Sequence, residues 1–423
     1  MLATLTGSLR IPDIRRKLAF TAAMLALFRI GAYVPAPGIN IDAVEQISSN
    51  FAGSNVLGFL NLFSGGSLQR FAIFALGIMP YITASIILQL MQVVVPSLEK
   101  LRKEGEVGQQ KITQYTRYLT VGLAFAQSIG YVFLFRSFGS SAGTSVVENF
   151  NFARVFVIVT TLTAGCVVIM WLGELITQRG IGNGISLMIF ASIVAGLPQG
   201  IQAWWTNPDQ VFRVMMPFLA LGIIAAIVYI QEGQRRIPVQ YAKRVVGRRM
   251  SGGGSTYLPL RVNMAGVIPV IFAASIMAFP PTIGELSQAG WAGDIAAFFS
   301  PNGWAYLVGE SIFIILFTYF YTAVTFNPVE QADNLKKYGG FIPGVRPGRP
   351  TAEFLDRILA RLTFPGALYL AAVAALPTIL INQTSANFFF GGTSILIVVG
   401  VALDTMKQLE AQLMMRNYEG FLK

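Results

Sequence analysis

Long apolar runs, separated by shorter polar segments, dominate the hydrophobicity pattern of this 423-residue chain. A membrane-spanning helix needs about 20 consecutive, mostly apolar residues, and windows of that kind recur along the whole sequence. They predict spans at residues 18–35, 71–95, 116–137, 153–173, 181–198, 211–231, 264–283, 305–326, 362–381 and 393–411. The pattern therefore predicts an all-α polytopic membrane protein with ten transmembrane helices.

One apolar segment departs from this pattern. Val56–Leu68 is too short to cross a bilayer, is interrupted by Ser64-Gly65-Gly66, and directly precedes the full-length run Phe71–Val95. A half-length segment at membrane depth is tolerated where protein or a water-filled cavity surrounds it. We therefore expect a re-entrant element beside a pore.

Charge is scarce but strongly asymmetric. Hydrophobic residues make up 54% of the chain and charged residues 12%, about half the charged share of soluble domains. Most of the 31 Lys and Arg residues fall at the N-terminus, at the C-terminus and in the loops between spans two and three, six and seven, and eight and nine. Because positive loops stay in the cytoplasm, this bias predicts that both termini are cytoplasmic.

The residues that most enzymes need are missing or badly placed. The chain has no histidine, which excludes a Ser-His-Asp triad and histidine-based metal sites. The only cysteine, Cys166, lies in an apolar run, so we expect a buried thiol and no intrachain disulfide. Glu174, Glu310 and Asp404 lie at or near span ends, and Gly180–Gly184 opens a span as a tight turn rather than a phosphate loop. We expect no catalysis, no cofactor and no metal.

Two cytoplasmic loops, 231–263 and 327–361, are unusually long and basic. The first contains a Gly-rich tip, Ser251–Ser255, and the second a turn-rich stretch that presents Arg346. One interpretation is topogenic charge together with attraction to anionic lipid. The other is a docking surface for an acidic cytoplasmic partner or for ribosomal RNA phosphate.

Isoleucines recur on single helix faces within the spans, at 78, 82 and 86 and again at 185 and 189. They fit ordinary helix packing, or a hydrophobic constriction that gates a pore. Polar residues within the spans are few, and they fit interhelical hydrogen bonds or a weak seam between separable helices.

Several segments resemble, in order, the SecY/Sec61-alpha family of protein-conducting channel subunits: Asn61–Leu90, Thr177–Pro198, Leu258–Pro280, Tyr338–Gly348 and Phe390–Met406. The resemblance implies two five-helix halves, residues 1–200 and 201–423, that are related as inverted repeats. It places an outer hinge at Pro198–Asp209 and makes the short segment before span two a re-entrant plug helix.

The resemblance also implies site residues in this sequence. The plug would comprise Leu60, Asn61, Leu62, Phe63, Ser64, Gly65, Gly66, Ser67, Leu68, Gln69 and Arg70, and the pore ring Ile78, Ile82, Ile189, Ile271 and Ile397. A lateral gate would pair Thr83 with Phe279 and Gln127 with Asn263, and Arg248, Arg249 and Arg346 would contact cytoplasmic partners. Those cytoplasmic partners would be the SecA motor or the ribosome with its RNA. The other partners of the channel would be the SecE and SecG subunits, signal-sequence-bearing chains and anionic lipids.

The implied function is a channel in the bacterial plasma membrane that translocates unfolded secretory polypeptides and releases hydrophobic segments laterally into the bilayer. By physics alone the main alternative is a secondary active transporter of a small solute. That alternative predicts a charged or ion-coordinating site near mid-membrane, which the spans do not offer. It also leaves the two long basic loops unexplained.

Overall fold

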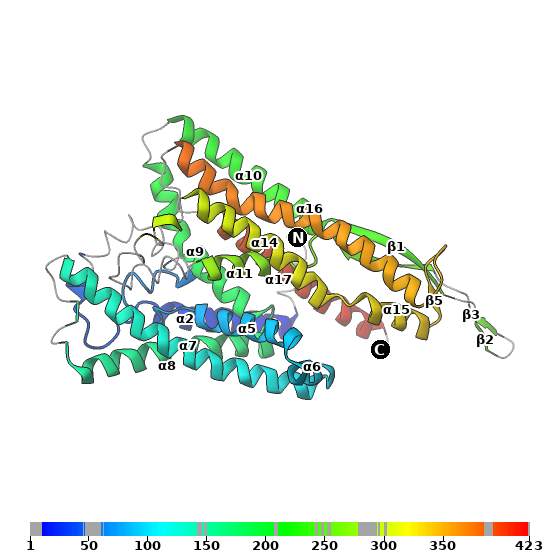
Figure 1. The fold of residues 1–423 in the computed structure, drawn as a ribbon, viewed down its shortest axis with the longest axis horizontal. Helices are drawn as coiled ribbons and strands as arrows, with labels where there is room; N and C mark the ends of the chain where they lie inside the picture. The colour runs from blue at the N-terminus through cyan, green and yellow to red at the C-terminus, as the bar shows by residue number, and fades with distance from the viewer. Residues whose placement is uncertain are drawn as a thin grey trace. The chain divides into compact units, whose positions relative to one another are not determined.

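The computed structural model describes residues 11–44, 46, 61, 63–141, 146–147, 150–206, 210–241, 244–246, 249–251, 255–277, 294, 297–299, 303–384 and 392–421. Helices dominate (Figure 1). They are α2 (Pro12–Gly31), α5 (Met79–Val94), α6 (Pro96–Lys103), α7 (Glu106–Ser141), α8 (Phe152–Arg179), α9 (Gly184–Trp205), α10 (Gln210–Glu232), α11 (Ile268–Met277), α14 (Trp304–Thr325), α15 (Pro328–Lys337), α16 (Arg349–Thr384) and α17 (Gly392–Phe421). The prediction of an all-α polytopic membrane fold is confirmed.

Each predicted span overlaps one of these helices. Within the part of the chain that the structure describes, six helical segments are long and apolar enough to cross a membrane. They are Glu106–Arg136, Phe152–Arg179, Gly184–Gln202, Arg213–Glu232, Trp304–Lys337 and Arg349–Leu376. Helices α5 and α6 meet at a 98° bend, and this pair would add a seventh if it counts as one span.

The second span differs from its prediction, because the helix begins at Met79 and not at Phe71. In the predicted re-entrant element and the stretch after it, Asn61 and Phe63 are helical, and residues 64–71 and 73–78 form turns on either side of an isolated β-bridge between Ala72 and Pro35. The backbone there has positive φ at Gly65, Gly66 and Gly77, which glycine adopts without steric strain. The apolar composition of this stretch is compatible with a helix, but the backbone conformation at these three glycines keeps it non-helical.

The chain forms two compact units. Unit 1 comprises Met1–Thr206, Ser275–Tyr306 and Val401–Lys423, and unit 2 comprises Asn207–Ala274 and Leu307–Gly400. The break at residue 206 falls within the segment predicted as a hinge. The division into halves at residues 200 and 201 stays a prediction, because unit 1 also takes two later segments.

Unit 1 is built around α8, which packs against α2, α7 and α9, while α5 packs against α7. Its largest fully buried side chains are aromatic and aliphatic groups from these helices and from the turn segment before α5. They include Phe28, Phe63, Phe71, Phe135, Leu162 and Ile169. Burying such side chains contributes about 1.5–3 kcal/mol each where the alternative is water.

Unit 2 contains a β-sheet that the sequence analysis did not predict. Strand β1 (Gln234–Tyr241) pairs antiparallel with β4 (Ser255–Arg261) and, at its end, with β5 (Gly340–Phe341). The hairpin continues into β2 (Arg244–Val246) and β3 (Arg249–Ser251), at its far end in Figure 1. The described parts of the two segments predicted as long loops therefore form one folded element, which we call the cytoplasmic lobe after its predicted side of the membrane (residues 234–261 and 326–361).

The cytoplasmic lobe has its own hydrophobic core, made of Ile237, Val239, Leu260, Phe326, Ile342, Leu355 and Leu359. The last two belong to α16, which begins at Arg349, well before the predicted start of span nine at residue 362. The helix extends because residues 349–361 carry apolar side chains at helical spacing, and the sheet covers that face. The core fixes the lobe to the end of a span.

Candidate functional site

The segment 61–70, which we call the plug turn, is held together by its own polar groups. The amide of Gln69 donates to the side-chain oxygen Oδ1 of Asn61 at 3.0 Å, and the amide of Gly66 donates to the Asn61 carbonyl at 2.9 Å. The amide of Leu68 donates to Ser64 Oγ at 3.1 Å, and Ser67 Oγ donates to the Ser64 carbonyl at 2.7 Å. These polar groups are therefore paired within the turn, which suits a segment that is mostly non-helical at its predicted depth in the membrane.

Backbone hydrogen bonds anchor the chain directly after the plug turn. The amide of Ala36 donates to the carbonyl of Phe71 at 3.0 Å, and the amide of Ile73 donates to the carbonyl of Val34 at 2.9 Å. Phe71 is fully buried, meets Phe135 of α7 edge-on at 4.3 Å between ring centroids, and has a φ of 47°. A bulky residue in this left-handed conformation costs about 1–2 kcal/mol, and the surrounding contacts hold it there.

The end of α2 and the residues just after it contact the plug turn through side chains. Arg29 Nη1 donates to the carbonyl of Gly65 at 2.6 Å, and Arg29 Nη2 donates to Tyr33 Oη at 3.0 Å. The guanidinium of Arg70 lies 4.2 Å from the centroid of the Tyr33 ring. The sequence analysis placed Arg70 in the plug but assigned no site role to Arg29 or Tyr33.

Helix α5 begins where the turns end and carries two predicted pore-ring residues. Ile78 is its N-cap, and the amide of Ile82 donates to the Ile78 carbonyl at 3.1 Å, one helical turn on. Both side chains are buried. Thr83, predicted for the gate, is buried as well, and its hydroxyl donates to the carbonyl of Met79 in its own helix at 3.0 Å.

Ile189 lies on α9 and is buried. As predicted, the Gly-rich stretch before α9 is a tight turn: Gly182 has a φ of 89°, and Asn183 caps the helix by accepting from the amides of Ile185 and Ser186. A Cβ atom at Gly184 would clash with the carbonyl oxygen of Gly173 in α8. Close backbone contact thus fixes where α9, and with it Ile189, starts.

The other two pore-ring residues, Ile271 on α11 and Ile397 on α17, belong to unit 2 and are buried. A Cβ atom at Gly400 would clash with Cγ1 of Val267, so the two helices approach closely at this point. Ile271 follows Val267 by one turn, and Ile397 precedes Gly400 by one turn. Spans seven and ten cross in opposite directions in the predicted topology, so the two isoleucines fall on the same side of this contact. Convergence of all five isoleucines stays a prediction.

The gate pairs are only partly described. Asn263 is buried; its Nδ2 donates to the carbonyl of Gly266 at 2.9 Å, while its Oδ1 has no partner among the described residues. Gln127 lies half-buried on α7. Phe279 lies outside the described residues, as do Leu60 and Leu62 of the plug and Arg248. The gate pairing therefore stays a prediction.

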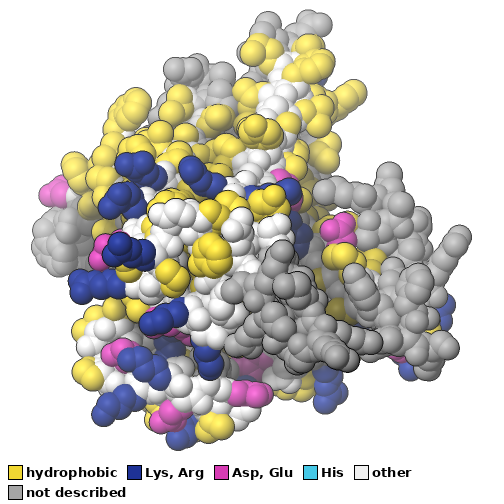
Figure 2. Space-filling view, turned by 90° about the vertical axis from the view of Figure 1, so that its right-hand side faces the viewer, with side chains coloured by type: hydrophobic (Ala, Val, Ile, Leu, Met, Phe, Trp, Pro, Cys, Tyr) yellow, Lys and Arg dark blue, Asp and Glu magenta, His cyan; other side chains and the backbone are white. Residues whose placement is uncertain are grey.

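Arg346 is exposed in the cytoplasmic lobe, in the turn between β5 and α16. Its carbonyl accepts from Thr351 Oγ1 at 2.8 Å, which fixes the turn to the start of α16. Arg249 begins β3, on the outer hairpin of the lobe. Lys and Arg side chains are spread over the face drawn in Figure 2, with apolar and acidic side chains between them.

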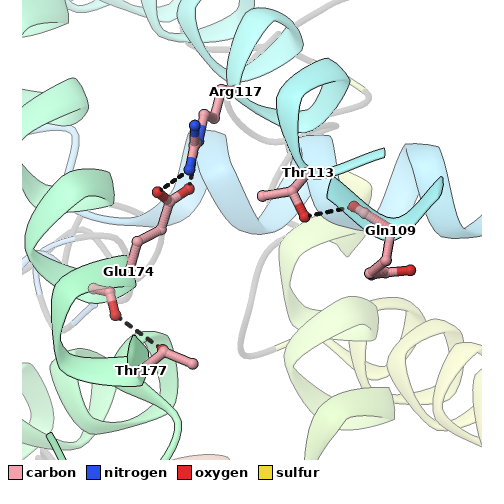
Figure 3. Close-up of polar contacts among 6 residues, drawn as sticks. Gln109, Thr113, Arg117, Glu174 and Thr177 are labelled. Atoms are coloured by element: carbon pink, nitrogen blue, oxygen red, sulfur yellow. Dashed lines mark hydrogen bonds and ion pairs between the residues drawn. The ribbon is translucent and has the colours of Figure 1, made fainter. Parts of the chain in front are cut away.

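An ion pair joins α7 to α8, and the sequence analysis did not predict it (Figure 3). Arg117 donates two hydrogen bonds to the Glu174 carboxylate, at 2.8 Å from Nε and 2.6 Å from Nη2. Tyr81 of α5 lies within electrostatic range of both charges. Opposite charges near the cytoplasmic ends of two consecutive spans were the available signal.

The described residues contain no cluster of three or more side chains suited to hold a metal ion. The prediction of a buried free Cys166 is confirmed. Glu310 is also buried, on α14, where the sequence analysis placed it at or near a span end.

Comparison with known proteins defines the class. The SecY family model matches residues 72–406. The chain is 49% identical to protein translocase subunit SecY of Mycobacterium tuberculosis over 100% of both chains, and 50% identical to that of Corynebacterium glutamicum over 97% of this chain and 98% of the relative.

Solved structures of the same fold include one described as a protein conducting channel, with a TM-score of 0.61 and 19% identity over 94% of this chain and 92% of the other. A second, in which the plug domain of SecY is described as stabilising the closed channel, has a TM-score of 0.62 and 20% identity over the same shares. The fold is that of a protein-conducting membrane channel. The chain belongs to the SecY family, so the resemblance is confirmed, and the transporter alternative has no support.

Proposed function

We propose that this chain forms the pore of a bacterial plasma-membrane translocon, with both termini in the cytoplasm, and that it moves unfolded polypeptides without changing them chemically. The observation that carries the proposal is the stretch from Asn61 to Ile82. In this stretch, a turn held by internal hydrogen bonds precedes α5. The start of that helix carries two buried isoleucines, Ile78 and Ile82. A stopper next to an apolar constriction is the simplest use of this arrangement.

The five isoleucines Ile78, Ile82, Ile189, Ile271 and Ile397 form the constriction in this proposal. An apolar ring excludes water and ions when it is closed. Its side chains carry no hydrogen-bonding groups, so the ring closes around a passing chain without preferring any sequence. The plug turn blocks the outer side of the ring while the channel rests.

The lateral gate opens between spans two and three and spans seven and eight, at Thr83, Phe279, Gln127 and Asn263. The side-chain oxygen Oδ1 of buried Asn263 has no hydrogen-bond donor among the described residues. Because a buried acceptor without a donor costs free energy, this supports a donor on another helix. The amide of Gln127 is the donor we assign to it. A translocating segment of about 20 apolar residues leaves through this gate into lipid.

The cytoplasmic lobe is the docking surface in this proposal. Arg346, Arg248 and Arg249 contact the SecA motor, or the phosphates of ribosomal RNA, and neighbouring basic residues contact anionic lipid. The folded core of the lobe, whose member Ile342 lies four residues before Arg346, supports this role, because a fixed surface binds with less loss of entropy than a flexible loop. Solved relatives with this fold include Sec61 in a canine ribosome–channel complex. SecE and SecG complete the translocon.

The test is photo-crosslinking to a stalled secretory chain in membrane vesicles. A photoreactive residue at Ile82 should crosslink to the stalled chain. The same residue at Val168, exposed on the surface of α8, should crosslink to lipid or not at all. Crosslinks to the chain at both positions, or at neither, would contradict the proposed path.

A further inference from the structure

The plug turn and the end of α2 clasp each other through two arginines. Arg29 of α2 reaches into the turn and donates to the Gly65 carbonyl at 2.6 Å. Arg70, at the end of the turn, places its guanidinium over the ring of Tyr33, which lies two residues past the end of α2. Each side of the contact therefore supplies one guanidinium to the other.

Tyr33 links the two arms. Its hydroxyl accepts from Arg29 Nη2 at 3.0 Å, and the guanidinium of Arg29 also lies 4.9 Å from its ring centroid. The ring thus contacts both guanidinium groups, as cation–π geometry allows within about 6 Å of a ring centroid. Because one aromatic side chain serves both arms, loss of either arginine affects the other arm.

The turn is shaped to accept this contact. Gly65 has a φ of 67°, and a Cβ atom there would lie 3.3 Å from Cα of Ser192 in α9 and 3.4 Å from Nη1 of Arg29. Glycine therefore lets the carbonyl sit within reach of the guanidinium while the turn lies close to α9. A hydrogen bond from a charged donor is about twice as strong as one between neutral groups.

The clasp and the backbone anchor act at different places. Residues 71 and 73 are bonded to the chain at 34 and 36 through backbone groups, which stay fixed if only the plug turn moves. The hydrogen bonds inside the turn move with it. The Arg29–Gly65 bond and the Arg70–Tyr33 contact, by contrast, break when the turn leaves α2.

We propose that Arg29, Tyr33 and Arg70 form a latch that holds the plug turn in the resting channel and so sets how strong a signal sequence must be to open it. The proposal rests on the proposed function, since it assumes that the turn is the movable stopper. Arg29 is a positioning residue in this scheme: it contacts the plug and never the translocating chain.

The experiment compares variants of the full chain, reconstituted with its partner subunits, by ion leak through the resting channel and by export of a substrate with a defective signal sequence. Arg29→Gln removes the charged donor, and we expect both readouts to rise about tenfold, the change that follows from losing one charge-assisted bond. Arg29→Lys keeps a charged donor for Gly65 but replaces the two guanidinium nitrogens that bond Gly65 and Tyr33 with a single ammonium nitrogen, so both readouts should lie between those of wild type and Arg29→Gln. Arg70→Gln should also raise both.

Arg16→Gln is the matched control, because Arg16 is an exposed arginine at the other end of the same helix. It removes the same charge and should leave both readouts at the wild-type level. Thermal exposure of buried Cys166 should be the same in Arg29→Gln and wild type, which separates release of a latch from damage to the fold.

Wild-type leak and wild-type export of the defective substrate in Arg29→Gln would overturn the latch, as would equal effects of Arg29→Gln and Arg16→Gln. A rise in leak accompanied by early exposure of Cys166 would also overturn it, since the residue would then support the fold. If the wild-type channel exports no substrate with an intact signal, the proposed function itself fails, whatever the leak.

Discussion

Removing Arg117 should destabilise unit 1 more than neutralising its partner Glu174. The Glu174 side chain is 14% exposed and that of Arg117 is 41% exposed. Arg117→Met therefore leaves a largely buried carboxylate without a partner, whereas Glu174→Gln leaves a guanidinium that can turn toward water. The two side chains share the same hydrogen bonds, so the difference in their exposed fractions decides which variant loses more stability.

The magnitudes follow from where this pair lies between two limits. Breaking a buried pair by removing one partner costs about 3–5 kcal/mol, while exposed pairs contribute about 0–1 kcal/mol. For a pair of intermediate burial we expect a loss of about 2 kcal/mol for Arg117→Met and about 1 kcal/mol for Glu174→Gln. A difference of 1 kcal/mol changes the folded-to-unfolded ratio about fivefold.

The chain carries its own reporter for this measurement. Cys166 is the only cysteine, is 1% exposed, and lies on α8 two turns before Glu174. A thiol-reactive dye should therefore label it at the lowest temperature in Arg117→Met, at an intermediate temperature in Glu174→Gln, and last in wild type. The double variant Arg117→Met, Glu174→Gln removes both charges and should be more stable than Arg117→Met alone.

Two results would refute this reasoning. Equal labelling temperatures for the two single variants would mean that burial of the carboxylate does not set the loss. A double variant whose loss equals the sum of the two single losses would mean that the two side chains do not act as a pair.

Three further predictions concern the pore, the lobe and the gate. Asparagine in place of Ile82 or Ile397 should raise resting ion leak and export of a defective-signal substrate severalfold, because a polar side chain lets water into the ring; unchanged leak and export would count against the ring. Arg346→Glu should reduce motor- or ribosome-dependent transport several-fold without lowering the temperature at which the protein unfolds; normal transport with normal partner binding would contradict the docking role. Cysteines at positions 83 and 279 should crosslink in the resting channel and block lateral release; failure to crosslink under oxidising conditions would contradict the gate pairing.

Apolar run length was enough to predict the spans, because the bilayer imposes one length on every crossing helix. It misplaced the start of span two, since Gly77 and its neighbours are as apolar as the helix that follows them. Phe71 shows the limit more sharply: its φ of 47° is set by packing against Phe135 and by the strand-like contact at residue 36. Contacts between distant residues decide such a conformation, and single-sequence patterns do not contain them.

The cytoplasmic lobe was missed for a different reason. Basic charge dominates residues 231–263, and a topological argument accounts for that charge without any folded structure. The signal for a sheet was the alternation of Ile237 and Val239, matched by Leu258 and Leu260 on the partner strand. This alternation is short, and the buried face of the sheet becomes clear only once α16 is known to begin at Arg349, well before the predicted span at 362.

In the proposed function, the plug turn has to meet two requirements that conflict in a membrane seal. A stopper must keep the resting pore closed to ions. It must also be able to leave the pore without exposing unpaired backbone groups to an apolar environment. The internal bonds of Asn61 and Ser64 meet the second requirement, because they travel with the turn. Closure then depends on the interactions that are lost when the turn moves away. These are the burial of Phe63 and Leu68 and the contacts with Arg29 and Tyr33. Since a passing chain replaces the apolar contacts but not the charged one, the latch is the part of the seal that remains specific to the closed state.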